Sequence, residues 1–210
     1  MTNIVTLTIV LGSAIFSAAA FNNRTIFEKY LFNAYAIKHH KQWYRFISHG
    51  FIHANWPHLI LNMFVLYSFG KSLEMVLFPA LFGKFSNLFY ILLYTGALFA
   101  ASIAEYFKNK DNPSYSSVGA SGAVNAIVFS FIVINPGAGM GMIFIPIAIP
   151  AWIFGLLFLA YSFYMNKRNT DNIGHGAHAW GAIFGFLFTG LLKPELFTVF
   201  FYTIFHPHFN

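Results

Sequence analysis

Residues 118–135 have the sequence VGASGAVNAIVFSFIVIN, in which no side chain carries a charge. The stretch belongs to a charge-free run over 112–166, and shorter runs of the same kind cover 1–23, 46–70, 85–104 and 172–192. A helix needs about 20 apolar residues to cross the hydrocarbon of a bilayer. Four of the runs therefore fit one helix each, and the longest fits two.

The composition of the 210-residue chain also indicates a membrane protein. Hydrophobic residues make up 58% and charged residues only 9%, whereas a soluble domain carries about 25% charged residues. The mean hydropathy is +0.62, and cysteine is absent. These values exclude a soluble enzyme, a secreted disulfide scaffold and a disordered tail.

The charge-free runs predict an all-α membrane protein with six transmembrane helices. The longest run is broken near Pro136, because the Pro and Gly residues of 135–139 favour a turn. The helices are expected at about 4–21, 58–77, 86–106, 118–135, 142–165 and 174–192. Pro146 and Pro150 should kink the fifth helix or thin its first turns.

Residues outside these helices complete a single domain, 1–210. The linker 22–57 holds five Lys or Arg, four His and an aromatic cluster, so we expect it to lie in the membrane interface. The tail after Lys193 is too short to span and should pack along the bundle. The first run lacks a positively charged start, and we expect a retained helix rather than a signal peptide.

The net charge of +6 does not indicate a nucleic-acid partner. The basic residues are scattered singly between apolar runs and form no basic stripe, which is typical of juxtamembrane anchoring. We therefore expect membrane lipid, and no nucleic acid, among the partners.

A few polar residues stand inside the apolar helices, where an uncompensated polar group is costly. His58 and Asn62 open the second helix, four residues apart and thus on one face. Gly119 and Ser121 open the fourth helix, and His178 lies near the start of the sixth. Even-numbered helices enter from the same side of the membrane, so these residues should lie at a similar depth and can converge.

These residue types suit acyl transfer. A serine hydroxyl becomes a strong nucleophile when a base within about 3 Å takes its proton, as His178 could do for Ser121. The Ser121 backbone N–H, the Asn62 amide and the His58 ring are candidate oxyanion donors. No carboxylate occupies the fourth or sixth predicted helix, so a dyad is indicated rather than a triad. Taken singly, each feature is more typical of helix packing or of an interfacial histidine.

Together the motifs resemble those of the rhomboid family of intramembrane serine proteases. The matching motifs are Tyr44-Arg45 in the linker, His53-x4-His58-Leu-x-x-Asn62-Met63 at the second helix, Phe69-Gly70-x-x-Leu73-Glu74 at its end, Gly119-Ala120-Ser121-Gly122-Ala123 at the fourth helix, and Ala177-His178-x-x-Gly181-x-x-x-Gly185 at the sixth. Their order and helix numbers agree with that family across residues from about 40 to 190.

The resemblance implies a six-helix rhomboid-like bundle and a serine endopeptidase that cleaves the transmembrane segments of single-pass membrane proteins. It implies Ser121 as nucleophile, His178 as general base, His58 and Asn62 as oxyanion donors, His53 as support for the loop above them, and Gly119 as part of the nucleophile motif. No metal or other cofactor is implied. The fifth helix and the loop 166–173 would correspond to the gate and cap of that family.

Two residues depart from the family's pattern. Asn125, one turn after the serine, stands where the family often has an aromatic ring that stacks under the base, which affects the orientation of His178 or the shape of the substrate pocket. Trp180 is bulky where small residues are usual, and it is expected to reshape the contact with a neighbouring helix.

The basic residues conflict with the orientation that the resemblance implies. With the N-terminus inside, the inner side carries Lys71, Lys84 and Lys193, and the opposite side carries the other nine Lys and Arg. The positive-inside rule would thus place the site in the cytoplasm. We favour the family's orientation, because the long linker is expected to be embedded. We therefore predict a multi-pass protein of the bacterial inner membrane whose site opens to the outer side.

Two alternative functions remain open. Three spacings resemble parts of the histidine boxes of membrane desaturases: His49-x3-His53, His53-x4-His58 and His175-x2-His178. Such a metal centre needs several His-His pairs, however, and His39-His40 is the only pair in the sequence. A non-proteolytic rhomboid-like chaperone is the second alternative. Such a relative would be expected to lack the serine or the histidine, and the chain keeps both.

Overall fold

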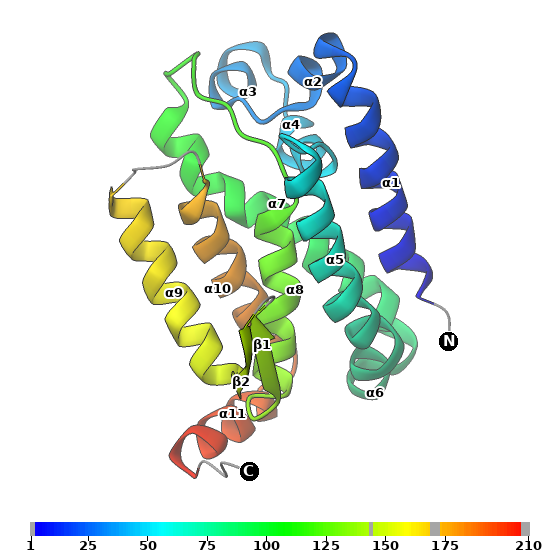
Figure 1. Cartoon of the computed structure of the whole chain (residues 1–210), viewed down its shortest axis with the longest axis vertical. Helices are drawn as coiled ribbons and strands as arrows, with labels where there is room; N and C mark the ends of the chain where they lie inside the picture. The colour runs from blue at the N-terminus through cyan, green and yellow to red at the C-terminus, as the bar shows by residue number, and fades with distance from the viewer. Residues whose placement is uncertain (1–2, 143–144, 169–172, 207–210) are drawn as a thin grey trace.

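A computed structural model describes residues 3–142, 145–168 and 173–206 (Figure 1). The described chain is mostly helical and contains one two-stranded hairpin. Six of its helices have 14 to 24 residues: α1 (Ile4–Phe21), α5 (Trp56–Ser72), α7 (Ser86–Asn109), α8 (Ser121–Ile134), α9 (Ala151–Arg168) and α10 (His175–Leu192). The shorter helices are α2 (Arg24–Tyr30), α3 (Ala34–His40), α4 (Arg45–Ser48), α6 (Phe78–Phe82) and α11 (Glu195–Phe205).

The long helices lie close to the predicted positions. α1 begins and ends at the predicted residues, and the boundaries of α7, α8 and α10 differ from the prediction by a few residues at most. By length and composition, Ile4–Phe21 and Trp56–Asn109 qualify as membrane spans, and α10 together with α11 would add a third. These spans indicate a membrane protein. That six helices cross the bilayer stays a prediction.

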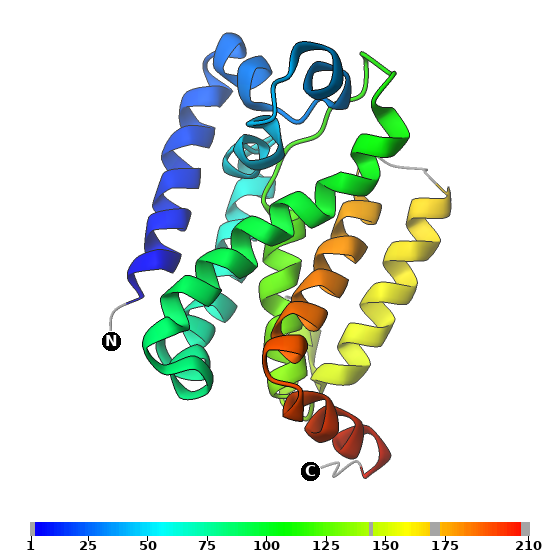
Figure 2. The same ribbon diagram turned by 180° about the vertical axis from the view of Figure 1, so that it is seen from behind.

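The three helices that carry the predicted site residues start at the same end of the molecule. In Figures 1 and 2 the first turns of α5, α8 and α10 lie at the end occupied by α2, α3 and α4, and α7 and α9 run the opposite way. The hairpin, α6 and α11 lie at the other end. Crossing parity, read from the sequence alone, therefore predicts correctly which helix ends meet.

The packing of α8 and α1 follows the rule for proteins that lie in lipid. α8 is the central helix, with most of its residues buried among α5, α7, α9 and α10. α1 buries only Thr6, Ser13, Ser17 and Ala20, while large apolar residues such as Ile15, which is 71% exposed, face outward. Helix contacts in membranes favour small and hydroxyl-bearing residues, because lipid is as apolar as leucine.

The predicted fifth helix, 142–165, starts too early. β1 (Gly139–Met142) and β2 (Ile145–Pro150) form an antiparallel hairpin, and α9 starts only at Ala151. A proline lacks the N–H donor of a helix and disfavours helical backbone in the preceding residue, so prolines at 146 and 150 keep the chain extended up to the second of them. Residues 143–144, which the prediction also placed in this helix, lie outside the described residues.

The predicted second helix, 58–77, is also interrupted. α5 gives way to a π-helical turn, Leu73–Leu77, before α6. The turn directs the buried Glu74 carboxylate at the start of α1, where it accepts from the backbone N–H groups of Val5 (2.7 Å) and Thr6 (2.8 Å). N–H groups of a first helical turn have no intrahelical acceptor, and a carboxylate there is stabilised by the helix dipole.

Arg45 organises the linker between α1 and α5. Its guanidinium is buried and donates to the backbone carbonyls of Glu28 (3.0 Å) and Leu31 (2.6 Å) and to the side chain of Gln42 (2.6 Å). Burial lowers the pKa of Arg45, but a guanidinium stays charged at any physiological pH. The linker is therefore a folded unit around one cation, not a flexible connection.

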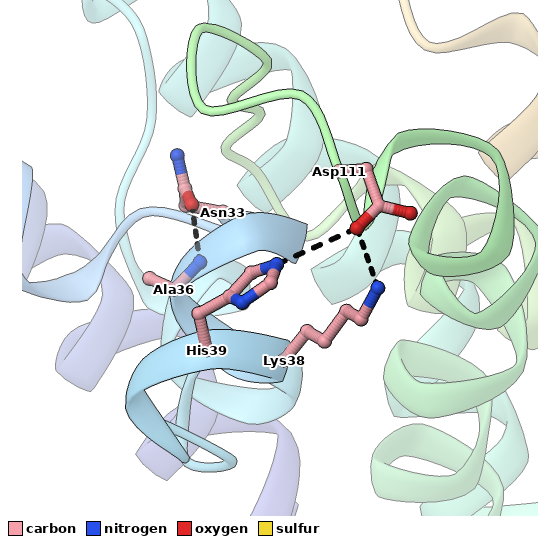
Figure 3. A network of polar contacts seen from close by, with 5 residues as sticks. All are labelled: Asn33, Ala36, Lys38, His39 and Asp111. Carbon is pink, nitrogen blue, oxygen red and sulfur yellow. Dashed lines mark hydrogen bonds and ion pairs between the residues drawn. The ribbon is translucent and has the colours of Figure 1, made fainter.

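The linker is attached to the segment that precedes Ser121. Figure 3 shows Lys38 and His39 of α3 directed at Asp111, which follows α7, and both pair with its carboxylate. Phe32 and Ser117 add a pair of backbone hydrogen bonds. Both contacts hold residues 110–120 against the linker.

The tail after α10 forms α11, which turns by 116° from α10. Leu196 and Phe200 are buried against the C-terminal half of α8, so this tail packs on the bundle as predicted. The last four residues, 207–210, lie outside the described residues.

Candidate active site

Ser121 and His178 are in hydrogen-bond contact. Ser121 is the first residue of α8, and His178 lies in the first turn of α10. Ser121 Oγ and His178 Nε2 are 2.8 Å apart, and both residues are half-buried. This is the geometry in which an imidazole can take the proton of an attacking hydroxyl.

Small residues hold the two helices in contact below this pair. A Cβ atom at Gly181 would lie 2.1 Å from the backbone oxygen of Gly122, and one at Gly185 would lie 2.1 Å from the backbone oxygen of Ala126. Only glycine fits at either position, so the two backbones touch. These two glycines of the predicted sixth helix thus allow the short serine side chain to reach a histidine on another helix.

The His58 ring lies against Gly119. Gly119 has φ +116°, and a Cβ atom there would lie 2.6 Å from Cε1 and 2.9 Å from Nε2 of His58. Both the backbone angle and the ring contact require glycine. The Ala54 N–H donates to His58 Nδ1 over 3.4 Å, so a neutral His58 ring carries its proton on Nε2. An N–H donor therefore lies beside the turn that leads to Ser121.

Asn62 lies one turn below His58 in α5 and is buried. Its Nδ2 donates to the His58 carbonyl over 2.9 Å. An amide nitrogen carries two hydrogens, and this contact uses one of them. The Ser121 backbone N–H belongs to the first turn of α8, where helical N–H groups lack intrahelical acceptors.

His53 does not reach the Ser121–His178 pair. Its buried ring lies 5.0 Å from the ring of His58, between centroids, and its Nε2 accepts from the Ala120 N–H over 3.4 Å. Burial, followed by the proximity of His58, lowers the pKa of His53 to about 3, so the ring is neutral. His53 thus contacts the residue just before Ser121.

Two further histidines near the site were not predicted to belong to it. The backbone carbonyl of His49 accepts from the Gly119 N–H at 2.9 Å. The His175 ring lies 5.9 Å from the ring of His178, between centroids. The sequence carried a signal for His175, which precedes His178 by three residues in α10, a spacing that puts two side chains on one helix face. It carried no such signal for His49, because the chain becomes extended at Ile52, between His49 and His53.

The two departures from the family pattern lie on α8 and α10. Asn125 is half-buried one turn after Ser121. Trp180 is 46% exposed on the outer face of α10, so its bulk is accommodated at the surface of the bundle. Of the predicted cap, 166–173, residues 169–172 lie outside the described residues.

A sequence model of the Rhomboid domain matches residues 40–195, which run from the end of α3 to the first residue of α11. The chain belongs to the rhomboid family. The matched region contains all of the predicted site residues: Ser121, His178, His58, Asn62, His53 and Gly119.

Three relatives carry the family name. The chain is 27% identical to "RHOMBOID-like protein 12, mitochondrial" of Arabidopsis thaliana, over 83% of this chain and 55% of that protein. It is 42% identical to "Rhomboid-like protein 11, chloroplastic" of the same plant, over 39% of this chain and 26% of that protein. It is 25% identical to "Presenilin-associated rhomboid-like protein A, mitochondrial" of Danio rerio, over 67% of this chain and 35% of that protein. The chain thus spans about half of the first relative and less of the other two.

Proposed function

We propose that this rhomboid-family protein is an intramembrane serine endopeptidase with Ser121 and His178 as its catalytic dyad. The observation that carries the proposal is the 2.8 Å contact between Ser121 Oγ and His178 Nε2 at the start of two helices whose backbones touch. A hydroxyl and an imidazole in this geometry are the nucleophile and the base of acyl transfer.

In the proposed reaction, Ser121 Oγ attacks the carbonyl carbon of a peptide bond while its proton passes to His178 Nε2. The carbonyl oxygen becomes an oxyanion, and the His58 Nε2–H, the Asn62 amide and the Ser121 backbone N–H are its proposed donors. His178 then gives the proton to the leaving amine, and an acyl-enzyme remains. Water, deprotonated by His178, releases the acyl group and restores the Ser121 hydroxyl.

The proposed substrates are transmembrane segments of single-pass membrane proteins. Three features support this class: the family, the start of α8 and α10 within an apolar bundle, and the half-buried dyad. A peptide bond inside a helix is shielded by its own hydrogen bonds, so we expect cleavage near small or helix-breaking residues. We further propose that six helices cross the bilayer and that α9, with residues 166–173, controls substrate entry.

The direct test is the Ser121→Ala variant, assayed with a test transmembrane substrate in liposomes. We expect complete loss of cleavage and of labelling by a fluorophosphonate, because both need the Ser121 hydroxyl. Ser68→Ala is the matched control, since Ser68 is exposed on α5 and its hydroxyl donates to the Phe64 carbonyl of its own helix. Cleavage that persists in a correctly folded Ser121→Ala protein would refute the dyad.

We also propose that the active-site end faces outward from a bacterial inner membrane, against the distribution of basic residues. The chain has no cysteine, so single cysteines can be placed by Lys108→Cys, Lys167→Cys and Lys84→Cys. An impermeant maleimide applied to intact cells should label the first two positions, at the site end, and spare Lys84→Cys at the opposite end. The reverse pattern would contradict this orientation and support the positive-inside rule.

The alternative functions are less well supported. For a metalloenzyme, His53 Nε2 and His58 Nδ1 are poor ligands because each accepts a backbone N–H. Within residues 3–142, 145–168 and 173–206, no three His, Asp or Glu side chains are grouped as a metal site. A non-proteolytic chaperone role predicts a different result for Ser121→Ala. A chaperone would still change membrane-protein levels in cells after the Ser121 hydroxyl is removed.

A further inference from the structure

Ser17 of α1 contacts the site although it lies outside the matched rhomboid region. It is fully buried, and its Oγ lies 3.0 Å from His53 Nδ1 and 3.1 Å from the backbone oxygen of Phe51. Among the described residues, the other hydroxyl groups of α1 make no hydrogen bond to the linker; Thr6, for example, binds Glu74 and Tyr90 instead. Ser17 therefore connects the first helix to the histidines near the dyad.

The hydrogen positions in this chain of contacts follow from the donors. The Ala120 backbone N–H can only donate, so His53 Nε2 must be the acceptor and carries no proton. A neutral imidazole then has its proton on Nδ1, which donates to Ser17 Oγ. The single proton of the Ser17 hydroxyl is left for the Phe51 carbonyl. One tautomer and one hydroxyl direction satisfy all three contacts.

The chain of contacts ends at the turn that leads to the nucleophile. The Gly119 N–H is bound by the His49 carbonyl, and the next N–H, of Ala120, is bound by His53. Two consecutive peptide planes are thereby oriented, which fixes Gly119 at φ +116° against the His58 ring. The Ser121 N–H lies in the next peptide plane, which follows the bound Ala120 N–H directly.

We propose that Ser17 is a positioning residue for the active site. It selects the His53 tautomer that accepts from the Ala120 N–H, and this bond fixes the turn before Ser121 against the His58 ring. This inference rests on the proposed function. Without the Ser17 oxygen, the buried Nδ1–H loses its acceptor, at the cost of an unsatisfied polar group. The ring can avoid this cost by moving its proton to Nε2, and the Ala120 N–H then loses its acceptor instead.

The test compares Ser17→Ala with Ser13→Ala. Ser13 is a serine of the same helix, fully buried one turn away, so its substitution controls for loss of a buried hydroxyl in α1. We expect Ser17→Ala to lower kcat roughly 10- to 100-fold with little change in KM, since small misplacements of reacting groups have effects of this size. Ser13→Ala should retain the wild-type kcat, and Ser17→Thr, which keeps the hydroxyl, should recover activity.

A second measurement separates this inference from the proposed function. Imidazole nitrogen-15 shifts of His53 report its tautomer whether or not the protein cleaves anything. We expect the wild type to carry the proton on Nδ1, and Ser17→Ala to populate the Nε2–H form and shift the Ala120 amide resonance. A wild-type proton on Nε2, or equal kcat values for Ser17→Ala and Ser13→Ala, would overturn the proposal.

If the wild type neither cleaves a substrate nor reacts with a fluorophosphonate, the proposed function fails on its own. The Ala120 amide resonance then still tests whether Ser17 positions the turn before Ser121. An unchanged resonance in Ser17→Ala would contradict that positioning.

Discussion

At the scale of the residue, Gly119 shows how two independent constraints meet at one position. Its φ of +116° is unfavourable for any side chain, and the space that a Cβ atom would occupy is filled by the His58 ring. The sequence predicted this glycine from its place in a motif. The structure adds the physical reason, because the missing side chain lets an imidazole approach the backbone next to Ser121.

The Gly119→Ala substitution tests this reason. We expect a loss of stability of about 1–3 kcal/mol from backbone strain and a fall in kcat of roughly 100-fold, because the displaced His58 ring no longer donates to an oxyanion. Thermal unfolding in detergent and cleavage kinetics would measure the two effects. Gly12→Ala is the control, since a Cβ at Gly12 meets no atom within 4 Å. Equal activity of the two variants would disprove a role for the His58 contact.

At the scale of the element, α8 and α10 are joined by contacts that repeat every four residues. Gly122 meets Gly181, Ala126 meets Gly185, and Ser130 meets Thr189, so that each contact joins residues 59 positions apart. A row of small residues alone would also tolerate a slip of one helical turn. The buried 2.7 Å contact between the Ser130 and Thr189 hydroxyls occurs in one register only, because a slip would leave both groups unpaired in an apolar interior.

A double-mutant cycle on Ser130→Ala and Thr189→Val measures this contribution. We expect each single variant to be destabilised and the pair to show a coupling energy of about 0.6 kcal/mol, with about 1.7 kcal/mol as the upper range for such bonds in membranes. Equilibrium unfolding in mixed micelles is the measurement. Thr95→Val serves as the matched control, because the Thr95 hydroxyl donates to the Ile91 carbonyl of its own helix. Zero coupling would mean that glycine packing alone sets the register.

At the scale of the whole molecule, a folded linker with two buried neutral histidines closes one end of the bundle. Burial lowers the pKa of His49 to about 4, and burial together with His58 lowers that of His53 to about 3. In the unfolded chain both return to about 6.5. Below about pH 6.5 the unfolded state therefore binds more protons than the folded state, and acid destabilises the fold.

The predicted pH dependence has a definite sign. The unfolding midpoint in detergent should be constant above about pH 7 and should fall steadily between about pH 6.5 and 4, because each unit of pKa depression corresponds to about 1.4 kcal/mol. His49→Gln should reduce this slope even if it lowers the midpoint at neutral pH. His40→Gln, at an exposed position, should leave the slope unchanged. A flat wild-type profile between pH 4 and 7 would contradict protonation-linked unfolding.

Much of the fold was predictable because lipid imposes simple rules on sequence. Long charge-free runs located α1, α7, α8 and α10 closely, since a buried charge is costly in hydrocarbon. The start of α9 and the end of α5 were predicted wrongly. Apolar character does not distinguish a strand from a helix, and it gives no signal of a π-helical turn.

For the candidate site, residue types and crossing parity were enough to bring Ser121, His178, His58 and Asn62 to one end of the bundle. Those two patterns depend only on local sequence and on counting helices. The contribution of α1 was not predictable in this way. Ser17 is one of several small polar residues on that helix, and only the packed arrangement places its hydroxyl on His53.

The sequence by itself determined that the chain lies in lipid, which helices carry the polar residues and which ends of those helices meet, because each follows from the cost of polar groups in hydrocarbon. Only the tertiary structure decided the 2.8 Å contact of Ser121 with His178 and the direction of each histidine proton. Distances and tautomers depend on where backbones touch and which N–H groups need acceptors, and these are properties of packed neighbours rather than of sequence neighbours.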